Sequence, residues 1–435
     1  MQGLRPRAAG WVVALALACA REAGPPEGPG PGASARADAP AEARADAAAE
    51  AGSPRACLAQ PVASAAATRC WVEWLAAPAL AGRAPGSPGG ATARAGIEAV
   101  LRDLSLEPAG ENGGYTQALP RGANVLARVR GRDPARAGEH VVVGAHHDHL
   151  GERGGAVYLG ADDNASGVAV LLELSRRLAA SPPARSVLIA AFDAEEPPAY
   201  RTPAMGSAHW VAQPTVPLGD VVAMLAMDLM GGNMWPGART PVYVMGRETV
   251  RATGAPALDG HAVPVRAMHL RLVEDLPGGR QAFSDHGAFF AAQIPSLLVS
   301  TGRSPHYHRV TDVADTLDYE KLAAEVAVVE AHVRWLADLP ERPGWEPAQP
   351  LRAADADALA GLLAAASGPG GSAELAGLAT SVVRADLARL RRLVAAAHGR
   401  PLTEDEARDV IAVSLRVQCL LTPDDEVPTA ACLML

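Results

Sequence analysis

The chain has 435 residues, a formal net charge of −9 and a hydrophobic content of 49%. This length allows one large domain with appendages, or two domains. The hydrophobic content, with 20% charged residues, excludes a disordered protein. The acidic balance, with no basic block to offset it, argues against nucleic acid as a partner. Aromatic residues make up only 4%, so the core must be built largely from Ala, Val and Leu.

The N-terminus has the pattern of an export signal. Arg5 and Arg7 precede a run of about eleven apolar residues, which is too short to span a bilayer as a stable helix. The following Cys19 stands in a segment that resembles a bacterial lipobox, in which the cysteine is acylated after cleavage. Ordinary cleavage after Ala18 is the alternative. We therefore expect a signal peptide over residues 1–18, and either an outer-membrane lipoprotein tethered through lipidated Cys19 or a periplasmic or secreted protein.

The segment after the signal cannot contribute to a core. Residues 20–56 contain no Val, Ile, Leu, Met, Phe, Trp or Tyr. A stretch without these side chains has nothing to bury, so we predict a disordered tether over residues 19–56. A tether after an acylated cysteine would hold a folded domain away from the membrane surface.

From residue 57 the pattern becomes that of an α/β protein. Residues 70–105 are predicted to be helical with a break at 82–90, and residues 169–178 form an amphipathic helix. The predicted strands are 125–129, 141–145, 186–192, 221–230 and 296–300. Continuous apolar strands alternating with helices predict a mixed, largely parallel central sheet flanked by helices. In such a sheet, ligands bind at the carboxyl ends of the strands.

The region after residue 340 differs in composition. Residues 341–350 are rich in proline and are predicted to be a linker. Beyond them are Ala/Leu helices interrupted by the glycines of 368–371, and residues 403–406 form a capping box before the last helix. We predict that residues 341–435 are a linker and an α-helical C-terminal extension, a helical cap or interaction module that carries no chemistry.

Four cysteines remain after Cys19, and an exported protein meets an oxidising environment. They are Cys57, Cys70, Cys419 and Cys432. Four cysteines allow three pairings, and the sequence does not choose among them. Free buried thiols are the alternative. None lies near the motifs described next, so we expect a structural role.

Five stations rich in His, Asp and Glu follow the predicted strands. They read GAHHDHLG (144–151), GADDNASG (160–167), FDAEE (192–196), MDLMG (227–231) and PHYHRVTD (305–312). Each alone is weak evidence, since paired acidic residues usually begin a solvated helix or cap one. Asp228 is more telling, because a carboxylate inside an apolar strand needs a partner or a metal. Five such stations in order are much less expected by chance than any single one.

Together with WLAAPALAGRAPGSPGG from Trp74, GENGGYTQA at 110–118 and SDHGAF at 284–289, these stations resemble the M28 family of zinc peptidases. The resemblance extends from about Trp74 to about Leu336. It implies a zinc exopeptidase fold, of the phosphorylase/hydrolase-like type, over residues 57–340. The implied activity is that of a metallo-exopeptidase, an aminopeptidase that removes N-terminal residues from peptide substrates.

Carried over residue by residue, the resemblance implies two Zn²⁺ ions per chain. His146 would bind one zinc ion and His308 the other, and Asp162 would bridge them. Glu196 and Asp228 would complete the two coordination shells with carboxylate oxygen, an ordinary zinc ligand. The peptide bond between Asp162 and the next residue is expected to be cis, as in relatives.

The resemblance also implies the catalytic groups. Glu195 would be the general base, which takes a proton from a metal-bridging water and delivers it to the leaving amine. Tyr307 would stabilise the oxyanion, with a packing aromatic as the alternative. Asp148 would orient the His146 imidazole, and Asp312 would act similarly near His308.

The sequence departs from the family pattern in two places. Residues 197–205 replace a short turn with a longer loop next to the implied site, so this loop should shape the substrate pocket. His147 stands where tyrosine is frequent. We expect His147 and the nearby His149, His286 and His306 to be structural residues and not ligands.

Two other functions remain open. One is a glutaminyl cyclase-like acyltransferase with a single zinc ion, which would leave His146 without a metal. The other is a metal-binding surface lipoprotein without catalysis, although Glu195 and all the implied ligands are present. The number of bound zinc ions distinguishes the cyclase from the aminopeptidase. Peptidase activity distinguishes the aminopeptidase from the non-catalytic lipoprotein.

Overall fold

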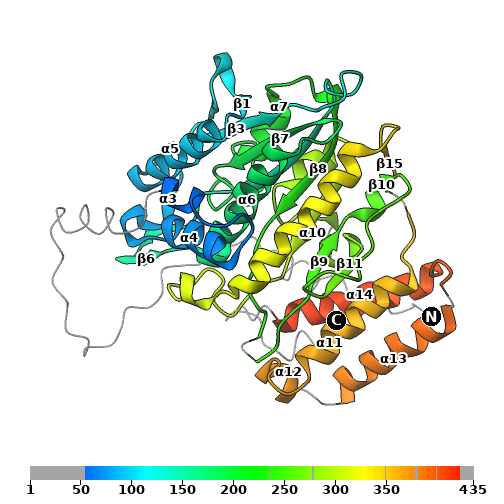
Figure 1. Cartoon of the computed structure of the whole chain (residues 1–435). Helices are drawn as coiled ribbons and strands as arrows, with labels where there is room; N and C mark the ends of the chain where they lie inside the picture. The colour runs from blue at the N-terminus through cyan, green and yellow to red at the C-terminus, as the bar shows by residue number, and fades with distance from the viewer. Residues whose placement is uncertain are drawn as a thin grey trace, which may run out of the picture.

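The computed structural model describes residues 54–421, apart from positions 236, 277–278, 348, 378–380 and 398 (Figure 1). The predicted signal peptide, Cys19 and nearly all of the predicted tether lie outside these residues. The first described helix is α3 (Pro54–Leu58), so the folded part begins slightly before the predicted start at Cys57. Within the described residues, none of the helices combines the length and the apolarity that a membrane span requires.

The described strands form one nine-stranded sheet in the order β1-β3-β7-β4-β8-β14-β9-β11, with β2 paired to β3. The central strands β7, β4, β8 and β14 run parallel, whereas β3 and β9 pair antiparallel with β7 and β14. The predicted mixed, largely parallel sheet is therefore confirmed. The strands are β1 (Glu107–Pro108), β2 (Thr116–Ala118), β3 (Ala123–Val129), β4 (His140–His146), β7 (Ser186–Phe192), β8 (Val221–Met227), β9 (Val242–Met245), β11 (Val265–Met268) and β14 (Ser296–Ser300).

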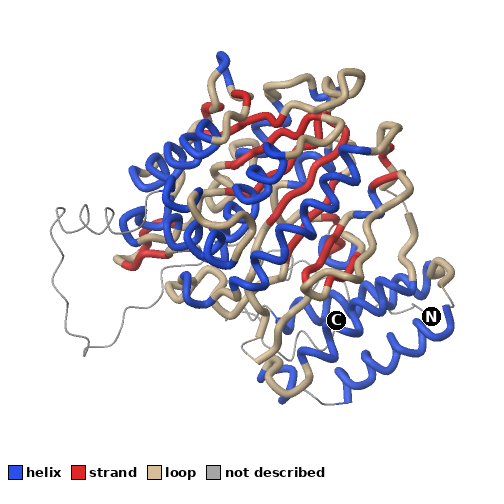
Figure 2. The backbone as a smooth tube through the Cα atoms, viewed as in Figure 1, coloured by secondary structure: helices blue, strands red, loops and turns tan. Residues whose placement is uncertain are grey.

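Helices cover both faces of this sheet (Figure 2). Because successive strand residues face opposite sides, Val141 and Val143 pack into one hydrophobic cluster and Val142 into the other. The first cluster includes α4 (Ala65–Leu75), α5 (Pro88–Asp103), α6 (Ser166–Ala180) and α10 (Tyr319–Asp338). The second includes α7 (Gly206–Ala212), α9 (His286–Ala291), α11 (Ala353–Ala366), α13 (Ser381–Ala397) and α14 (Glu404–Leu421).

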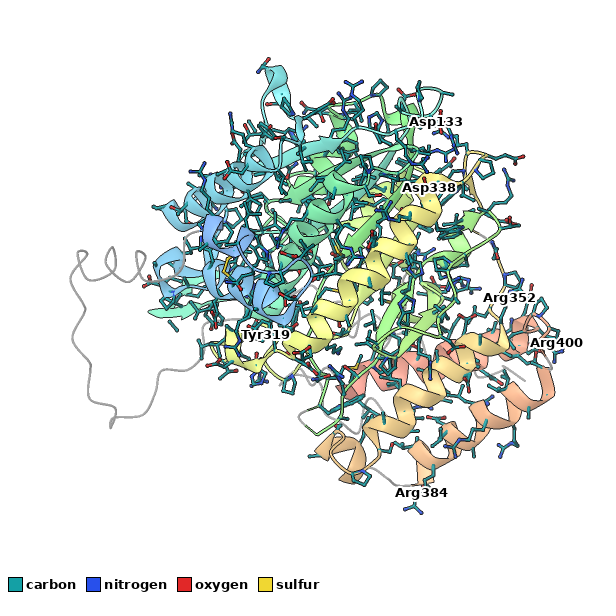
Figure 3. All side chains as sticks on the ribbon, in the orientation of Figure 1. Asp133, Tyr319, Asp338, Arg352, Arg384 and Arg400 are labelled. Carbon is teal, nitrogen blue, oxygen red and sulfur yellow. A yellow bond between two sulfur atoms is a disulfide. The ribbon has the colours of Figure 1, made fainter. Side chains whose placement is uncertain are left out.

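Several helices begin at polar caps that the sequence supplies. The hydroxyls of Ser64 and Ser87 accept backbone N–H bonds at the starts of α4 and α5. Between these helices lies the short turn η1 (Pro78–Arg83), which accounts for the predicted break. At the start of α10, Asp318 accepts the N–H of Lys321 at 2.9 Å. Figure 3 labels Tyr319 and Asp338 at the two ends of this helix.

The C-terminal helices pack directly against the sheet domain. Part of the predicted linker is a strand, since β15 (Gly344–Trp345) pairs with β10 (Val250–Arg251). The helices α11, α13 and α14 share a hydrophobic cluster with one face of the sheet, and α12 (Ala373–Gly377) lies between α11 and α13 along the chain. The predicted capping box is present, because Glu406 accepts the N–H of Thr403 and the Thr403 hydroxyl accepts the N–H of Glu406.

One disulfide joins Cys57 of α3 to Cys70 of α4, with their Cα atoms 5.5 Å apart. Cys419 is disulfide-bonded as well, and Cys432 lies outside the described residues. Cys57 and Cys70 therefore do not pair with the C-terminal cysteines, a choice that the sequence left open. Further short elements include α8 (Arg271–Glu274). Two-stranded pairs are formed by β5 (Gly151–Arg153) with β6 (Ala156–Tyr158) and by β12 (Asp275–Leu276) with β13 (Gly279–Arg280).

Candidate active site

The carboxyl ends of four neighbouring parallel strands carry the acidic and histidine stations. β4 ends at His146, β7 leads to Glu195 and Glu196, β8 is followed by Asp228, and β14 leads to His308. The remaining station, second in chain order, is the turn η3 (Ala161–Ala165), which comes directly before α6. Because the ends of parallel strands meet at one edge, residues far apart in sequence are brought together there.

Two triads of potential metal ligands share one carboxylate. The His146 Nε2 atom lies 3.4 Å from Asp163 Oδ1 and 3.5 Å from Asp228 Oδ1. The His308 Nε2 atom lies 3.2 Å from Asp163 Oδ2 and 3.3 Å from Glu196 Oε2. The donor atoms of His146, Asp163 and Asp228 all lie within 4.8 Å of one another. Imidazole nitrogen and carboxylate oxygen in this arrangement fit zinc, and Asp163 has one oxygen for each triad.

This geometry corrects the prediction that Asp162 is the bridging residue. The Asp162 carboxylate lies against the backbone of Gly232, where an added Cβ would be 2.5 Å from Oδ2. It is buried outside both triads, and the nearby charge of Lys321 partly offsets the rise in its pKa that burial causes. The cis peptide bond is correspondingly Asp163–Asn164 and not Asp162–Asp163. Two adjacent side chains leave the backbone in different directions, so only one of them can enter the site.

Asp312 holds the turn that aims Asp163. Its Oδ1 accepts the backbone N–H of Asp162 at 2.8 Å, and its Oδ2 accepts that of Asp163 at 3.1 Å. Asp312 was expected to act near His308, but its carboxylate bonds are to the η3 backbone instead. Both oxygens of this buried side chain are thereby used to fix the orientation of one turn.

Asp148 connects the first station to the third. Its two carboxylate oxygens accept the backbone N–H groups of Glu195 and Glu196, each at 3.1 Å. Its Oδ1 lies 3.6 Å from His146 Nδ1, and its backbone carbonyl lies closer, at 3.2 Å. Asp148 therefore positions the Glu195–Glu196 backbone, and its carbonyl is the nearer partner of the imidazole.

Glu195 lies beside the triads without a strong partner of its own. Its Oε2 is 3.9 Å from His146 Nε2, and its Oε1 has no hydrogen-bond partner among the described residues. Burial raises the pKa of this carboxyl well above its usual range, and the nearby Asp228 and Glu196 carboxylates add to the rise against the opposing effect of His146. A buried carboxyl with a raised pKa and a free oxygen is suited to accept and return a proton.

The neighbouring histidines divide into two groups. The structure brings His149, expected to be structural, into the site. Its Nδ1 lies 2.9 Å from Glu196 Oε1, and His149, Asp163 and Glu196 form a further group at ligand spacing, besides the two triads. His147 points away, toward Ala123 and Asp193. Nor do the other two rings join the triads, since His286 contacts Glu274 and His306 contacts Thr311.

Tyr307 stacks on the ring of His308, with ring centroids 3.9 Å apart. The guanidinium carbon of Arg303 lies 4.5 Å from the centroid of the same Tyr307 ring. Burial raises the pKa of the Tyr307 hydroxyl well above its usual range, so the hydroxyl keeps its proton and can donate a hydrogen bond. Its ring position is set by His308 and Arg303.

The longer loop over residues 197–205 lies next to Glu195, as predicted. Its Tyr200 hydroxyl donates to the carbonyl of Phe283 at 3.2 Å, and Arg201 donates to Gln281 Oε1 at 2.7 Å. The charge of Glu195 contributes to the raised pKa of Tyr200, after the larger effect of burial.

A surface cavity of about 410 Å³ opens beside His308 and is lined by Tyr158, Pro305, His306, His308, Arg309, Val310 and Thr311.

Arg83, a buried cation close to the site, was not identified from the sequence. Its guanidinium donates to the carbonyls of His147 at 2.8 Å and Gly160 at 2.9 Å. It also donates to the carbonyls of Leu75 and Leu159. Burial lowers its pKa to about 10, so it remains charged at neutral pH. Arg83 thus joins the first station to the turn that precedes Asp163.

One family profile and several known proteins are similar to this chain. The profile of peptidase family M28 matches residues 124–333. The chain is 34% identical over 215 residues to the uncharacterized protein YfbL of Escherichia coli (strain K12), an alignment covering 43% of this chain and 64% of that protein. It is 36% identical over 115 residues to the glutaminyl-peptide cyclotransferase-like protein of Bos taurus, covering 25% of this chain and 29% of that protein. The chain thus spans less than two thirds of each of these relatives.

Among solved structures, the LapA aminopeptidase of Legionella pneumophila is similar with a TM-score of 0.48 and 18% identity, over 69% of this chain and 76% of that chain. The family match begins in β3 and ends near the end of α10. The segment that matches peptidase family M28, residues 124–333, therefore contains both triads and Glu195.

Proposed function

We propose that this protein is a zinc-dependent aminopeptidase that hydrolyses the N-terminal residues of peptides. The observation that supports this most strongly is the pair of triads that share Asp163, with Glu195 beside them and one of its oxygens free. The match of residues 124–333 to peptidase family M28 supports peptide hydrolysis as the reaction class.

The proposed site takes two zinc ions. His146, Asp163 and Asp228 would hold one ion, and Asp163, Glu196 and His308 the other. Bound zinc supplies Lewis acidity, which polarises a substrate carbonyl and lowers the pKa of water. The three carboxylates offset the repulsion between two nearby cations. His149 lies close enough to Glu196 to fix the orientation of that carboxylate.

The chain's own groups carry the proton transfers. Glu195 takes a proton from the attacking water and returns it to the leaving amine, which its position beside but outside the triads allows. Tyr307 donates a hydrogen bond to the oxygen that becomes negatively charged. Asp148 keeps Glu195 and Glu196 at a fixed separation through their backbone N–H groups.

The test is replacement of Glu195 by Gln, which removes the base and keeps the size of the side chain. We expect kcat on an aminoacyl-nitroanilide panel to fall by about 10²- to 10⁴-fold, the usual contribution of general acid–base catalysis. The zinc content should not change, because Glu195 is not one of the proposed ligands. A chelator should abolish the wild-type activity, and N-terminally blocked substrates should be refused. Retained activity in the variant contradicts the mechanism.

A glutaminyl cyclase-like acyltransferase with one zinc ion is the second candidate, supported by the partial identity to the Bos taurus protein. The two candidates predict different metal contents. Two zinc ions per chain would support the aminopeptidase, in which His146 is a ligand. One ion, together with cyclisation of N-terminal glutaminyl peptides, would support the cyclase.

A further inference from the structure

We propose that the ammonium group of Lys321 positions the metal centre, by holding the segment after Asp228 so that this carboxylate can bind zinc. The inference rests on the proposed two-zinc site and assigns to it a residue that is not itself a ligand. The first ion is the one proposed for the triad with Asp228, and the second ion is the one proposed for the triad with His308.

Lys321 is exceptional in the composition of this chain. Of the 39 lysine and arginine residues, only Lys321 is a lysine. Its side chain is fully buried, which is rare for a lysine unless the ammonium has partners. An ammonium is a compact point charge, whereas a guanidinium is a planar fork of donors. A chain that otherwise uses arginine therefore carries its single ammonium at a buried position, which indicates that the shape of the group matters there and not its charge alone.

The Lys321 ammonium binds one segment of chain and its flank. Its Nζ donates to the carbonyl of Gly232 at 2.6 Å, to Asn233 Oδ1 at 3.2 Å and to Thr240 Oγ1 at 3.2 Å. A charged lysine has three N–H donors, and these three acceptors use all of them. A neutral amine has only two N–H groups, so the contacts require the charged form.

The segment that Lys321 holds begins directly after a proposed ligand. Residues 229–233 follow Asp228, and Leu229 has a φ of 58°. A leucine keeps this left-handed conformation only where the surrounding structure holds it. The near end of the segment is fixed by Thr301, whose hydroxyl donates to the Leu229 carbonyl at 2.9 Å. Lys321 fixes the far end, so its loss would let the strained backbone relax and carry the Asp228 carboxylate out of its triad.

Lys321 is also the counter-charge of two buried carboxylates. Glu325 lies on the same helix, and its Oε2 accepts the N–H of Gly231 at 2.8 Å. Burial lowers the pKa of the Lys321 ammonium, and the charges of Glu325 and Asp162 oppose that effect. Removing the cation would leave these two carboxylates buried without it, which further favours movement of the segment that Glu325 contacts.

The second ion depends on other supports. Asp312 holds the turn that carries Asp163 through two backbone N–H groups, at 2.8 and 3.1 Å. His308 belongs to the segment after β14. Among the described residues, the side-chain hydrogen bonds of Lys321 reach neither that segment nor that turn. A general loss of stability would weaken the binding of both ions, whereas loss of the positioning contact should weaken the first ion alone.

The experiment titrates zinc into the demetallated full chain in competition with a chromophoric chelator. In Lys321→Met, which keeps the length of the side chain without its charge or donors, we expect the Kd of the first ion to rise at least about tenfold. The second ion should bind as in the wild type. Two backgrounds identify the ions, since His308→Ala removes a ligand of the second and His146→Ala a ligand of the first. Lys321→Met should weaken the remaining ion in His308→Ala and leave it unchanged in His146→Ala.

Three further variants separate the ammonium from its charge and from stability. Lys321→Arg keeps the charge, but a planar fork does not place its donors toward three acceptors around one nitrogen, so it should weaken the first ion as well. Thr240→Val keeps the shape of the side chain and removes one acceptor, so it should weaken the same ion less. Arg185→Met removes a buried cation at the amino end of β7, opposite the site, and should bind both ions as the wild type does.

The inference is overturned if Lys321→Met binds both ions as tightly as the wild type, if it weakens both ions equally, or if Lys321→Arg matches the wild type. Should Lys321→Met fail to fold, Thr240→Val decides, and an unchanged Kd of the first ion there overturns the inference. A wild-type chain that binds fewer than two zinc ions contradicts the proposed function itself. That outcome is read from the wild type alone, so the two failures are distinguishable.

Discussion

At the scale of single residues, two adjacent aspartates have different surroundings. Asp163 contacts both His146 and His308, whereas Asp162 faces Gly232 and lies near Lys321. The distinction comes from the η3 turn, which Asp312 holds through two backbone N–H groups. The identity of the shared carboxylate therefore depends on the conformation of one turn.

This distinction predicts different metal contents for two nearly identical variants. If the site takes the two proposed zinc ions, Asp163→Asn should lose most of both and its activity, because an amide oxygen cannot replace a carboxylate shared by two cations. Asp162→Asn should keep two zinc ions per chain. Metal analysis of the purified, folded variants checks the prediction. Loss of zinc from Asp162→Asn with retention in Asp163→Asn would contradict the placement.

The sequence predicted the stations but not every role within them. Glu195, Glu196, Asp228 and His308 were assigned from the resemblance to the M28 family, and the structure brings all four to one edge of the sheet. The choice between Asp162 and Asp163 depends on turn geometry, which two identical neighbouring residues do not reveal. Arg83 was not predicted either, since a lone arginine in a Gly/Pro-rich segment gives no sign that it will bind four backbone carbonyls.

At the scale of elements, the last helix supports a segment close to the site. The side chains of Ser414 and Gln418 on α14 both donate to the backbone carbonyl of Leu272 in α8. The same short helix ends at Glu274, which accepts hydrogen bonds from His286 and Arg280. Gln281, which directly follows Arg280 in sequence, accepts a hydrogen bond from Arg201 of the loop over residues 197–205. The C-terminal extension thus has a structural connection to the wall of the proposed substrate cleft.

We therefore expect the double variant Ser414→Ala/Gln418→Ala to bind peptides more weakly. Removing both donors leaves a carbonyl unsatisfied, which costs about 1–3 kcal/mol of local stability. KM should rise several-fold while kcat and zinc content change little, because the triads lie elsewhere. Steady-state kinetics with metal analysis measure both. Arg408→Ala, on an exposed side chain of the same helix, is the control, and an equal change in KM there would contradict the connection.

The elements themselves were largely predictable, because their patterns are local. The strands predicted at 186–192 and 296–300 match β7 and β14, and the capping box at Thr403 is present. Residues 341–350 were predicted to be a linker because proline dominates them. The pairing of Gly344–Trp345 with Val250–Arg251 joins distant segments, and local composition contains no information about such a partner.

At the scale of the whole molecule, buried histidines make stability depend on pH. His332 in α10 donates from Nδ1 to the carbonyl of Val328 at 2.8 Å, and its Nε2 has no hydrogen-bond partner among the described residues. Burial lowers its pKa to about 4. In the unfolded chain its pKa is near the usual 6.5, so the unfolded state binds the proton first as the pH falls.

Replacement of His332 by Gln should reveal this contribution. Stability from the neutral imidazole is fully present above pH 6.5 and is lost as the pH falls toward 4, by about 3 kcal/mol in total. The difference in unfolding free energy between wild type and variant should therefore shift in favour of the variant over that range. Urea unfolding at several pH values measures it, and taking the difference cancels the pH dependence of the metal site. A difference that does not vary with pH would show that His332 is not buried in its neutral form.

The order of the central strands has a consequence for how this protein can diverge. β7, β4, β8 and β14 are immediate neighbours, and backbone hydrogen bonds hold neighbouring strands about 4.8 Å apart whatever side chains they carry. The separation between their terminal residues does not depend on the length of the connections that join them. Insertions such as residues 197–205 can therefore accumulate at this edge without moving the donor atoms, so selectivity and metal geometry are free to evolve separately.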